Sequence, residues 1–211
     1  MNMFYNDIDF NTFTRDLYDK QVSIILLDEE KQIQGFSTQK IISVDMDSAP
    51  VHGVFSGDTI IHKDYWGSWI FFRLFARYYI EESKKYDSFY WFLTSKGYKT
   101  YKILPLFYKE YYPNRVLPTP ESVRQIINHF GQTISPDDFN PETGVIEYKQ
   151  IKDKLKPDIG VLKQRHLNDP DIAFFNKQNP GHVDGNDLVC LTRLTEDNLT
   201  QQGKKLLLNT D

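Results

Sequence analysis

The sequence predicts an α+β fold, in which helices flank a mixed, mostly antiparallel central sheet and a C-terminal extension follows. Residues 21–27 and 32–44 are rich in β-branched and apolar side chains and are joined by a polar turn, which is typical of an antiparallel hairpin. A third strand is expected at residues 51–62, and a near-continuous apolar strand at residues 88–94. Because a helix separates these last two strands, they should lie parallel and be joined by a right-handed crossover.

A first helix is expected at residues 7–20, before the hairpin. Its apolar side chains recur with helical spacing, at Phe10, Phe13 and Leu17. Asp7, or the asparagine before it, has the side chain needed to cap the start of this helix.

The clearest helix begins after Gly67, and a tight turn at residues 65–68 joins it to the strand before it. A strand that leads directly into a helix N-terminus forms a ready anion site, because the first N–H groups of the helix have no partners within it. The apolar face of this helix is expected to hold Ile70, Phe71, Leu74, Phe75 and Tyr78.

The whole chain is expected to be one domain, with a core half at residues 1–113 and an insertion or lid at residues 114–211. The second half should also supply C-terminal strands and a helix that complete the same domain. Residues 98–112 are expected to form a helix that Pro105 kinks or splits. The later elements expected are a helix at 121–130, a weak strand at 145–148, short strands at 171–175 and 188–192, and a helix at 195–208.

Composition excludes several classes of protein. The net charge is −4 and acids and bases are well mixed, so no basic stripe favours nucleic acid as a partner. No apolar run reaches the roughly 18 residues of a membrane span, and the N-terminus lacks the pattern of a signal peptide. The single Cys190 rules out an intrachain disulfide and fits a cytoplasmic protein. The five histidines show no metal-ligand spacing, so no metal is expected. The aromatic content of 15% makes a homodimer possible.

The order helix, hairpin, strand, turn, helix, strand, helix resembles the GNAT superfamily of N-acetyltransferases, as does the stretch TIIHKDYWGSWIF at residues 59–71. The resemblance covers about residues 21–113. In that family the turn has the pattern Q/R-x-x-G-x-G/A, and its backbone N–H groups hold the pyrophosphate of acetyl-CoA. Here Trp66 stands in place of Arg or Gln, and Trp69 and Phe71 stand in place of small residues. Their rings either fill the cofactor's space or turn into the core and leave the main-chain donors free.

The resemblance implies acetyl-CoA as cosubstrate and a small or peptidic amine as acceptor. It implies Asp58 as the base that receives the amine proton, and Tyr108, with Tyr101 next, as the acid for the leaving thiolate. Lys63 and Lys96 could pair with the cofactor's phosphates. The residues implied for cofactor binding are Ile60, Ile61, His62, Trp66, Gly67, Ser68, Trp69, Ile70, Thr94 and Ser95.

Each of these residues also has an ordinary structural interpretation, as a strand acid, a core tyrosine or an exposed lysine. The sequence therefore predicts an acyl-CoA-dependent N-acyltransferase and leaves two alternatives open. One is a catalytically inactive binding or interaction protein of the same fold, whose cofactor turn is filled by aromatic side chains. The other is an unrelated α+β domain.

Overall fold

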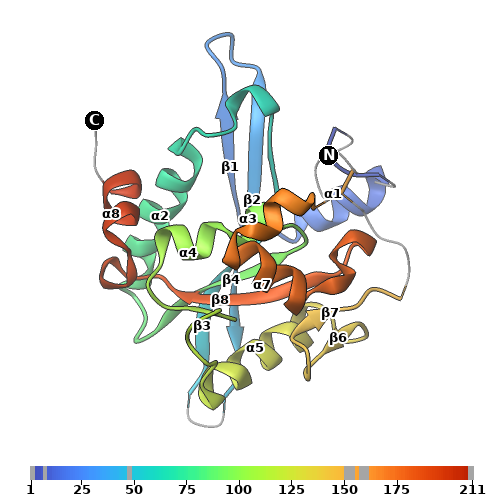
Figure 1. The fold of residues 1–211 in the computed structure, drawn as a ribbon. Helices are drawn as coiled ribbons and strands as arrows, with labels where there is room; N and C mark the ends of the chain where they lie inside the picture. Colours follow the sequence, from blue (N-terminus) through green and yellow to red (C-terminus); the bar gives the residue numbers. More distant parts are fainter. Residues whose placement is uncertain (1–2, 7–8, 47–48, 150–154, 157–161, 209–211) are drawn as a thin grey trace.

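One mixed sheet organises the molecule (Figure 1). The computed structural model describes residues 3–6, 9–46, 49–149, 155–156 and 162–208. Within them the strands follow the order β1-β2-β3-β4-β8-β7-β6, and β5 pairs with β8 off this path. The strands are β1 (Val22–Leu27), β2 (Ile33–Val44), β3 (Val51–Ile61), β4 (Phe89–Ser95), β5 (Tyr111–Tyr112), β6 (Phe139–Asn140), β7 (Val145–Ile146) and β8 (Asp187–Arg193).

Seven α-helices and four short 3₁₀ helices are found in the described ranges. The α-helices are α1 (Phe10–Tyr18), α2 (Ile70–Ser83), α3 (Tyr98–Tyr101), α4 (Ile103–Phe107), α5 (Glu121–Ile134), α7 (Pro170–Gln178) and α8 (Gln201–Leu207). The 3₁₀ helices are η1 (Lys63–Tyr65), η2 (Gln164–Asn168), η3 (Pro180–Asp184) and η4 (Glu196–Asn198).

The predicted fold class is confirmed: the protein is α+β, with a mostly antiparallel mixed sheet flanked by helices. β1 and β2 form the predicted antiparallel hairpin. Among the described strand pairs, β3 and β4 alone run parallel, and α2 connects them, as the strand–helix–strand pattern predicted. The C-terminal strand β8 lies beside β4 in the middle of the sheet, so the second half of the chain completes the first.

The strand predicted at 171–175 is wrong, because these residues lie in helix α7. Asp169 caps this helix by accepting hydrogen bonds from the N–H groups of Asp171 and Ile172, at 2.9 and 3.2 Å. Pro170 occupies the first turn, where its missing N–H costs nothing. Ile172 and Phe175, three residues apart, are the buried side chains of one helical face.

Other boundaries differ in smaller ways. The helix predicted at 98–112 divides at Lys102 and not at Pro105, and it ends at Phe107. Tyr111 and Tyr112 instead form strand β5, because they pair with β8, which lies far along the chain. The final helix is shorter than predicted and follows η4. Asp9 caps α1, and the cap predicted at Asp7 lies outside the described residues.

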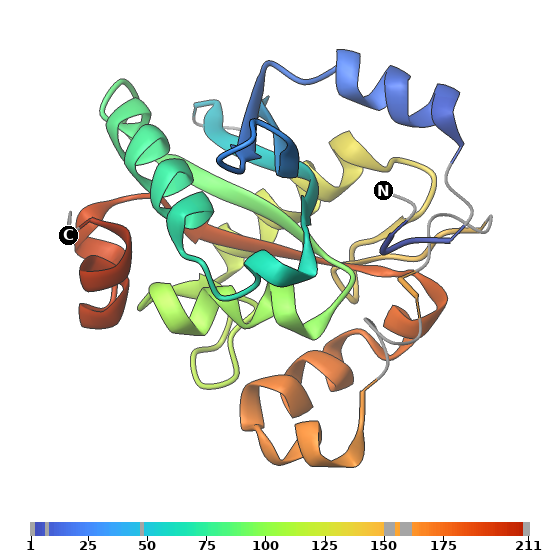
Figure 2. The same ribbon diagram turned by 90° about the horizontal axis from the view of Figure 1, so that it is seen from above.

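The two faces of the sheet carry separate cores, as the alternation along β4 shows. Phe89, Trp91 and Leu93 pack in one cluster with α2, α4 and α8. Phe92 faces the other way and stacks on Phe130 of α5, with ring centroids 4.3 Å apart. Figure 2 shows α1 (blue) and α5 (yellow) on one side of β8 and α7 (orange) on the other. Each buried aromatic ring contributes roughly 1.5–3 kcal/mol of transfer free energy. The clusters on the two faces therefore both stabilise the sheet.

Helix α2 buries a different stripe from the one predicted. Phe71, Phe75 and Tyr79 are almost fully buried, whereas Ile70, Leu74 and Tyr78 are about half exposed, at 46%, 49% and 52%. No helix in the described part of the chain combines the length and the hydropathy needed to cross a lipid bilayer.

Candidate functional site

The parallel strands β3 and β4 separate at one end, and this separation creates the candidate site. Their pairing runs from His52 and Phe89 to Ser56 and Leu93 and stops there, although β3 continues to Ile61. On its other edge β3 pairs with β2, where Ser56 pairs with Gln39 and Thr59 pairs with Ser37. Gly57 and Asp58 therefore both lie opposite the single β2 residue Thr38. An extra residue of this kind is a β-bulge, which bends its strand and re-aims side chains. The bulge therefore lies where β3 turns away from β4.

A cavity of about 1270 Å³ lies along the separated strand ends. This exceeds the roughly 300–1,000 Å³ of a typical small-molecule site, so the cavity can hold an extended ligand or two ligands at once. Its walls come from α1, the bulged end of β3, the turn before α2, the end of β4, and α3 with α4. We call it the cleft. It lies at the end of β3 that leads into η1.

The N-terminus of α2 opens onto the cleft without a side-chain cap. Trp69 occupies the N-cap position, and its side chain accepts no hydrogen bond from the helix. The Trp69 carbonyl accepts from the Arg73 N–H at 2.8 Å, so the N–H groups of residues 70–72 precede the first bond of the helix. Gly67, with φ of +94°, makes the turn that a side chain would strain. Uncapped N–H groups and the helix dipole together favour an anion here.

Two of the three aromatic rings in question turn into the core. Trp69 packs edge-on against Phe107, with ring centroids 5.3 Å apart. Phe71 is 3% exposed. Both still border the cleft, but their rings are held by neighbours on the α4 side and within α2. Both rings are therefore held against neighbouring aromatic side chains at the edge of the cleft.

Trp66 behaves differently and lies across the end of β3. Its Nε1 donates to the carbonyl of Ile61 at 2.9 Å, and the residue is 44% exposed. Lys99 Nζ, from α3, stands 4.2 Å from the centre of the indole ring, and the ring of Phe4 is 6.0 Å away. The contact with Lys99 is of cation–π type, worth about 0.5–1 kcal/mol at an exposed site. This contact connects the turn before α2 with α3, which form two of the walls of the cleft.

A short polar network lies beside the bulge, and two of its members, Ser37 and Thr59, line the cleft. Ser37 and Thr59 share a hydrogen bond of 2.7 Å, and Gln39 Nε2 donates to Ser37 Oγ at 2.7 Å. Gln39 Oε1 is buried and has no hydrogen-bond partner among the described residues. A buried acceptor left in this way costs about 1–3 kcal/mol, but Gln39 does not itself line the cleft.

The structure brings together most of the residues that the sequence predicted for the site. Those lining the cleft are Asp58, Ile60, Ile61, Trp66, Gly67, Ser68, Trp69 and Thr94. His62, Ile70 and Ser95 do not line it. The ring of His62 faces the Asp64 carboxylate, Ile70 lies half exposed on the surface of α2, and Ser95 is fully buried with its hydroxyl donating to the Gly97 carbonyl. Lys96 lines the cleft 3.7 Å from Asp187, whereas Lys63 does not line it.

Neither predicted acid, Tyr108 nor Tyr101, lines the cleft. Tyr101 is fully buried and its hydroxyl donates to the Pro113 carbonyl at 3.0 Å. Tyr108 is 2% exposed, and its ring lies 6.0 Å from that of Trp91, which does border the cleft. Burial raises the pKa of both hydroxyls well above the usual value, because the phenolate would lose its hydration. Their role as acid stays a prediction.

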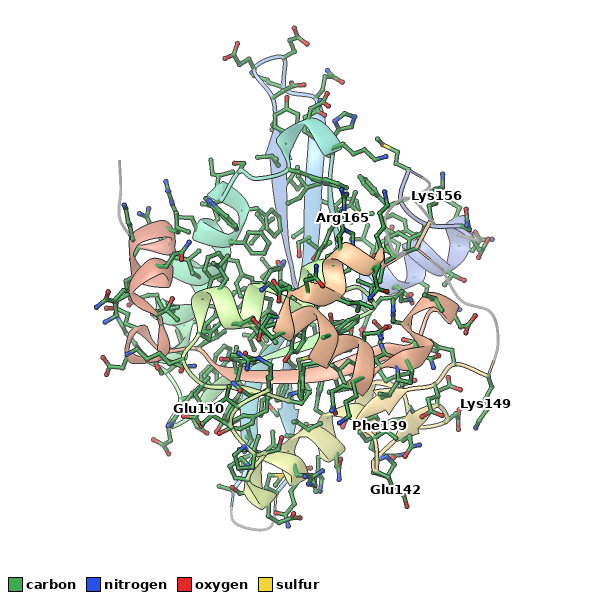
Figure 3. All side chains as sticks on the ribbon, in the orientation of Figure 1. Glu110, Phe139, Glu142, Lys149, Lys156 and Arg165 are labelled. Carbon is green, nitrogen blue, oxygen red and sulfur yellow. The ribbon has the colours of Figure 1, made fainter. Side chains whose placement is uncertain are left out.

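Sequence reasoning missed the contribution of α1 and of the residues next to it. Phe13 and Asp16 of α1, Lys20 after it, and Phe55 of β3 all line the cleft. The apolar repeat of α1 predicted a helix but carried no signal of where that helix packs. The chain near Leu155 also reaches this region, because Lys156 donates its N–H to the Phe4 carbonyl at 2.8 Å. Figure 3 shows the side chains of Lys156 and Arg165 in the same upper half of the molecule, with Glu110 and Glu142 in the lower half.

No family model and no curated protein sequence matches this chain. In the described residues, no group of three or more His, Cys, Asp or Glu side chains is arranged to hold a metal ion. Function is therefore inferred from the cleft, the bulge in β3 and the uncapped N-terminus of α2.

Proposed function

We propose that this protein is an acyl-CoA-dependent N-acyltransferase that moves an acetyl group from acetyl-CoA to an amine. One observation carries the proposal: two parallel strands separate beside a β-bulge, and the uncapped N-terminus of α2 opens onto the cleft between them. This arrangement offers an anion site and a long trough next to each other, which an elongated ligand with a pyrophosphate needs.

In the proposal the pyrophosphate lies at the N-terminus of α2, against the main-chain N–H groups of residues 70–72. These donors come from the backbone, so having Trp66 in place of Arg or Gln, and Trp69 and Phe71 in place of small residues, does not remove them. The pantetheine arm extends along the end of β3 beyond its last pairing with β4, at Ser56, where the strand edge can bond its amides. Lys99 is a further cation on the rim, next to Trp66.

Asp58 is the proposed base, because it lines the cleft at the bulge. The amine nitrogen attacks the thioester carbonyl carbon, the C–N bond forms and the C–S bond breaks. The amine proton passes to the Asp58 carboxylate, directly or through a water, and the thiolate leaves with the electron pair of the C–S bond. A thiol has a pKa of about 8.5, so a thiolate is an acceptable leaving group near neutral pH. The proposal therefore needs no proton from Tyr101 or Tyr108.

The alternative is a binding protein of the same fold that transfers no acyl group. The bulky ring of Trp66, which lines the cleft and is held at the end of β3, favours it. The two functions differ in measurable ways: a protein whose cofactor turn is filled should not bind acetyl-CoA, whereas the transferase should bind it and release the free thiol in the presence of an amine.

Calorimetric titration with acetyl-CoA tests the proposal first. Binding with a dissociation constant in the micromolar range supports it, and no heat or thermal shift at 1 mM acetyl-CoA, a generous upper concentration for such a site, would overturn it. Thiol release with a panel of amines then separates the transferase from the binding protein.

The partners belong to the same proposal. We expect a small or peptidic amine as acceptor, no nucleic acid and no membrane as partner, and the capacity to form a homodimer. The net charge of −4 and the lone, buried Cys190 support a cytoplasmic setting.

A further inference from the structure

The cleft reaches a group of buried, mostly apolar side chains at the point where β3 and β4 separate. Ser56 of β3 and Leu93 of β4 form the last pair of the two strands, and both line the cleft. Trp91 of β4 and Phe75 of α2 line it as well. These four residues are 6%, 4%, 4% and 3% exposed, respectively, so this part of the wall is withdrawn from solvent. We call these four residues the inner end of the cleft.

The inner end presents apolar surface, and none of its four side chains is charged. Trp91 Nε1 donates to Ser56 Oγ at 2.8 Å, which uses the single donor of the indole. The rings of Phe75 and Trp91 pack with their centroids 4.8 Å apart. Phe72 of α2 and Leu106 of α4, which pack against the same core cluster, also line the cleft. A wall of this kind favours an apolar group over water or an ion.

The order of groups along β3 directs the acyl end of the proposed cosubstrate toward the inner end. From the strand separation at Ser56, β3 runs past Asp58 to Ile61, and η1 and the turn before α2 follow. The pyrophosphate is proposed at the N-terminus of α2, and the thioester carbonyl beside Asp58. A chain that continues beyond this carbonyl in the same direction reaches Ser56 after two residues, which is about 7 Å along a strand. With C–C bonds of about 1.5 Å, a saturated chain of about five carbons covers this distance.

We infer that the acyl group transferred by this protein is an uncharged, apolar chain of about four to six carbons, longer than acetyl. The inference rests on the proposed function, and it makes acetyl-CoA the smallest donor that the site accepts and not the preferred one. The chain lies against Leu93, Trp91 and Phe75, where its burial adds affinity in proportion to the area removed from water. A carboxylate at the end of the chain would meet no opposite charge among these side chains, so burying it there is unfavourable.

Calorimetric titration with a series of CoA thioesters tests this inference and does not require the amine to be known. Free CoA measures the cofactor site alone, and acetyl-, butyryl- and hexanoyl-CoA lengthen the chain stepwise. We expect butyryl-CoA to bind about tenfold more tightly than acetyl-CoA, because each buried methylene contributes roughly fourfold, and hexanoyl-CoA to bind at least as tightly as butyryl-CoA. Succinyl-CoA has as many acyl carbons as butyryl-CoA but ends in a carboxylate, so it should bind no better than acetyl-CoA.

A substitution at the strand separation tests where the chain lies. Ser56→Leu places a larger side chain at the inner end, and it should lower the affinity for butyryl- and hexanoyl-CoA to that for acetyl-CoA while free CoA binds as before. Val54→Ile is the matched control, because Val54 is buried in the same core cluster, two residues earlier in β3, and does not line the cleft. It should keep the wild-type preference. Thermal melting shows whether both variants fold, and the wild-type series with succinyl-CoA decides the question if Ser56→Leu does not.

The series separates this inference from the proposed function. If free CoA and acetyl-CoA bind but the affinity does not rise with chain length, the inference is overturned and the cofactor site stands. Equal affinities for succinyl- and butyryl-CoA would also overturn it, as would an unchanged chain-length preference in folded Ser56→Leu. If neither free CoA nor any thioester binds at about 1 mM, the proposed function fails, and the acyl-chain inference fails with it.

Discussion

Replacing Ser68 with aspartate tests whether the α2 N-terminus holds an anionic cofactor, because the substitution should stabilise the helix and weaken cofactor binding. Ser68 is exposed, lies one residue before the N-cap of α2 and lines the cleft. A carboxylate at this position stabilises the helix dipole by about 0.3–1 kcal/mol. The same carboxylate repels a pyrophosphate bound to the helix N–H groups.

The size of the repulsion follows from Coulomb's law. At about 6 Å and an effective dielectric constant of roughly 20–40, one pair of unit charges costs about 1.4–2.8 kcal/mol, which is about ten- to a hundredfold in affinity. Salt screens this term over a Debye length of about 10 Å at 0.1 M, so the difference from wild type should shrink as salt is raised.

The assay is a calorimetric titration of acetyl-CoA into wild type, Ser68→Asp and the neutral control Ser68→Asn, with thermal melting of each protein. We expect weaker cofactor binding in Ser68→Asp alone, with an unchanged or higher melting temperature. Equal affinity for all three proteins at low salt would refute the placement of the pyrophosphate at α2.

Three further predictions follow from the site and the core. Asp58→Asn should lower kcat by about 10²–10⁴-fold, the usual contribution of a general base, and leave acetyl-CoA affinity unchanged; an undiminished kcat would remove Asp58 from the mechanism. Tyr108→Phe should leave kcat within about twofold if the reaction needs no proton from Tyr108, which is 2% exposed and does not line the cleft; a loss near a hundredfold would assign the role of the acid to Tyr108. Burial lowers the pKa of His182 below its usual value, against the opposing charge of Asp184, so the unfolded chain takes up the proton first and the free energy of unfolding should fall as pH drops from about 7 to 5. His182→Gln should flatten that dependence in urea denaturation, and an unchanged slope would contradict the assignment.

The elements that the sequence predicted well are those fixed by local patterns. The hairpin and the unit of β3, α2 and β4 have clear periodicity and turn residues, and these signals do not depend on distant parts of the chain. The error at 171–175 arose because a short apolar run such as Ile-Ala-Phe-Phe fits a strand or a buried helix equally. The cap signal of Asp169 and Pro170 favoured the helix, and the structure follows it.

The parts of the site that the sequence could not predict depend on tertiary contacts. The direction of the Trp69 ring is set by Phe107, which lies far along the chain. The place of α1 over the cleft, and with it the burial of Lys20, depends on how the hairpin lies against the rest of the sheet. The bulge at Gly57 and Asp58 depends on the register with β2. A glycine in the strand indicated that a bulge was possible there, but the register alone fixes it.

Hydrogen–deuterium exchange with and without saturating acetyl-CoA tests the central claim most directly, because it reports where the cofactor binds. We predict slower exchange in peptides that cover the bulged end of β3, the turn and the first residues of α2, together with the end of β4, and no change in α5, none of whose residues lines the cleft. Saturating cofactor that leaves exchange at residues 57–72 unchanged would contradict the proposal that the cleft between β3 and β4 is the acyl-CoA site.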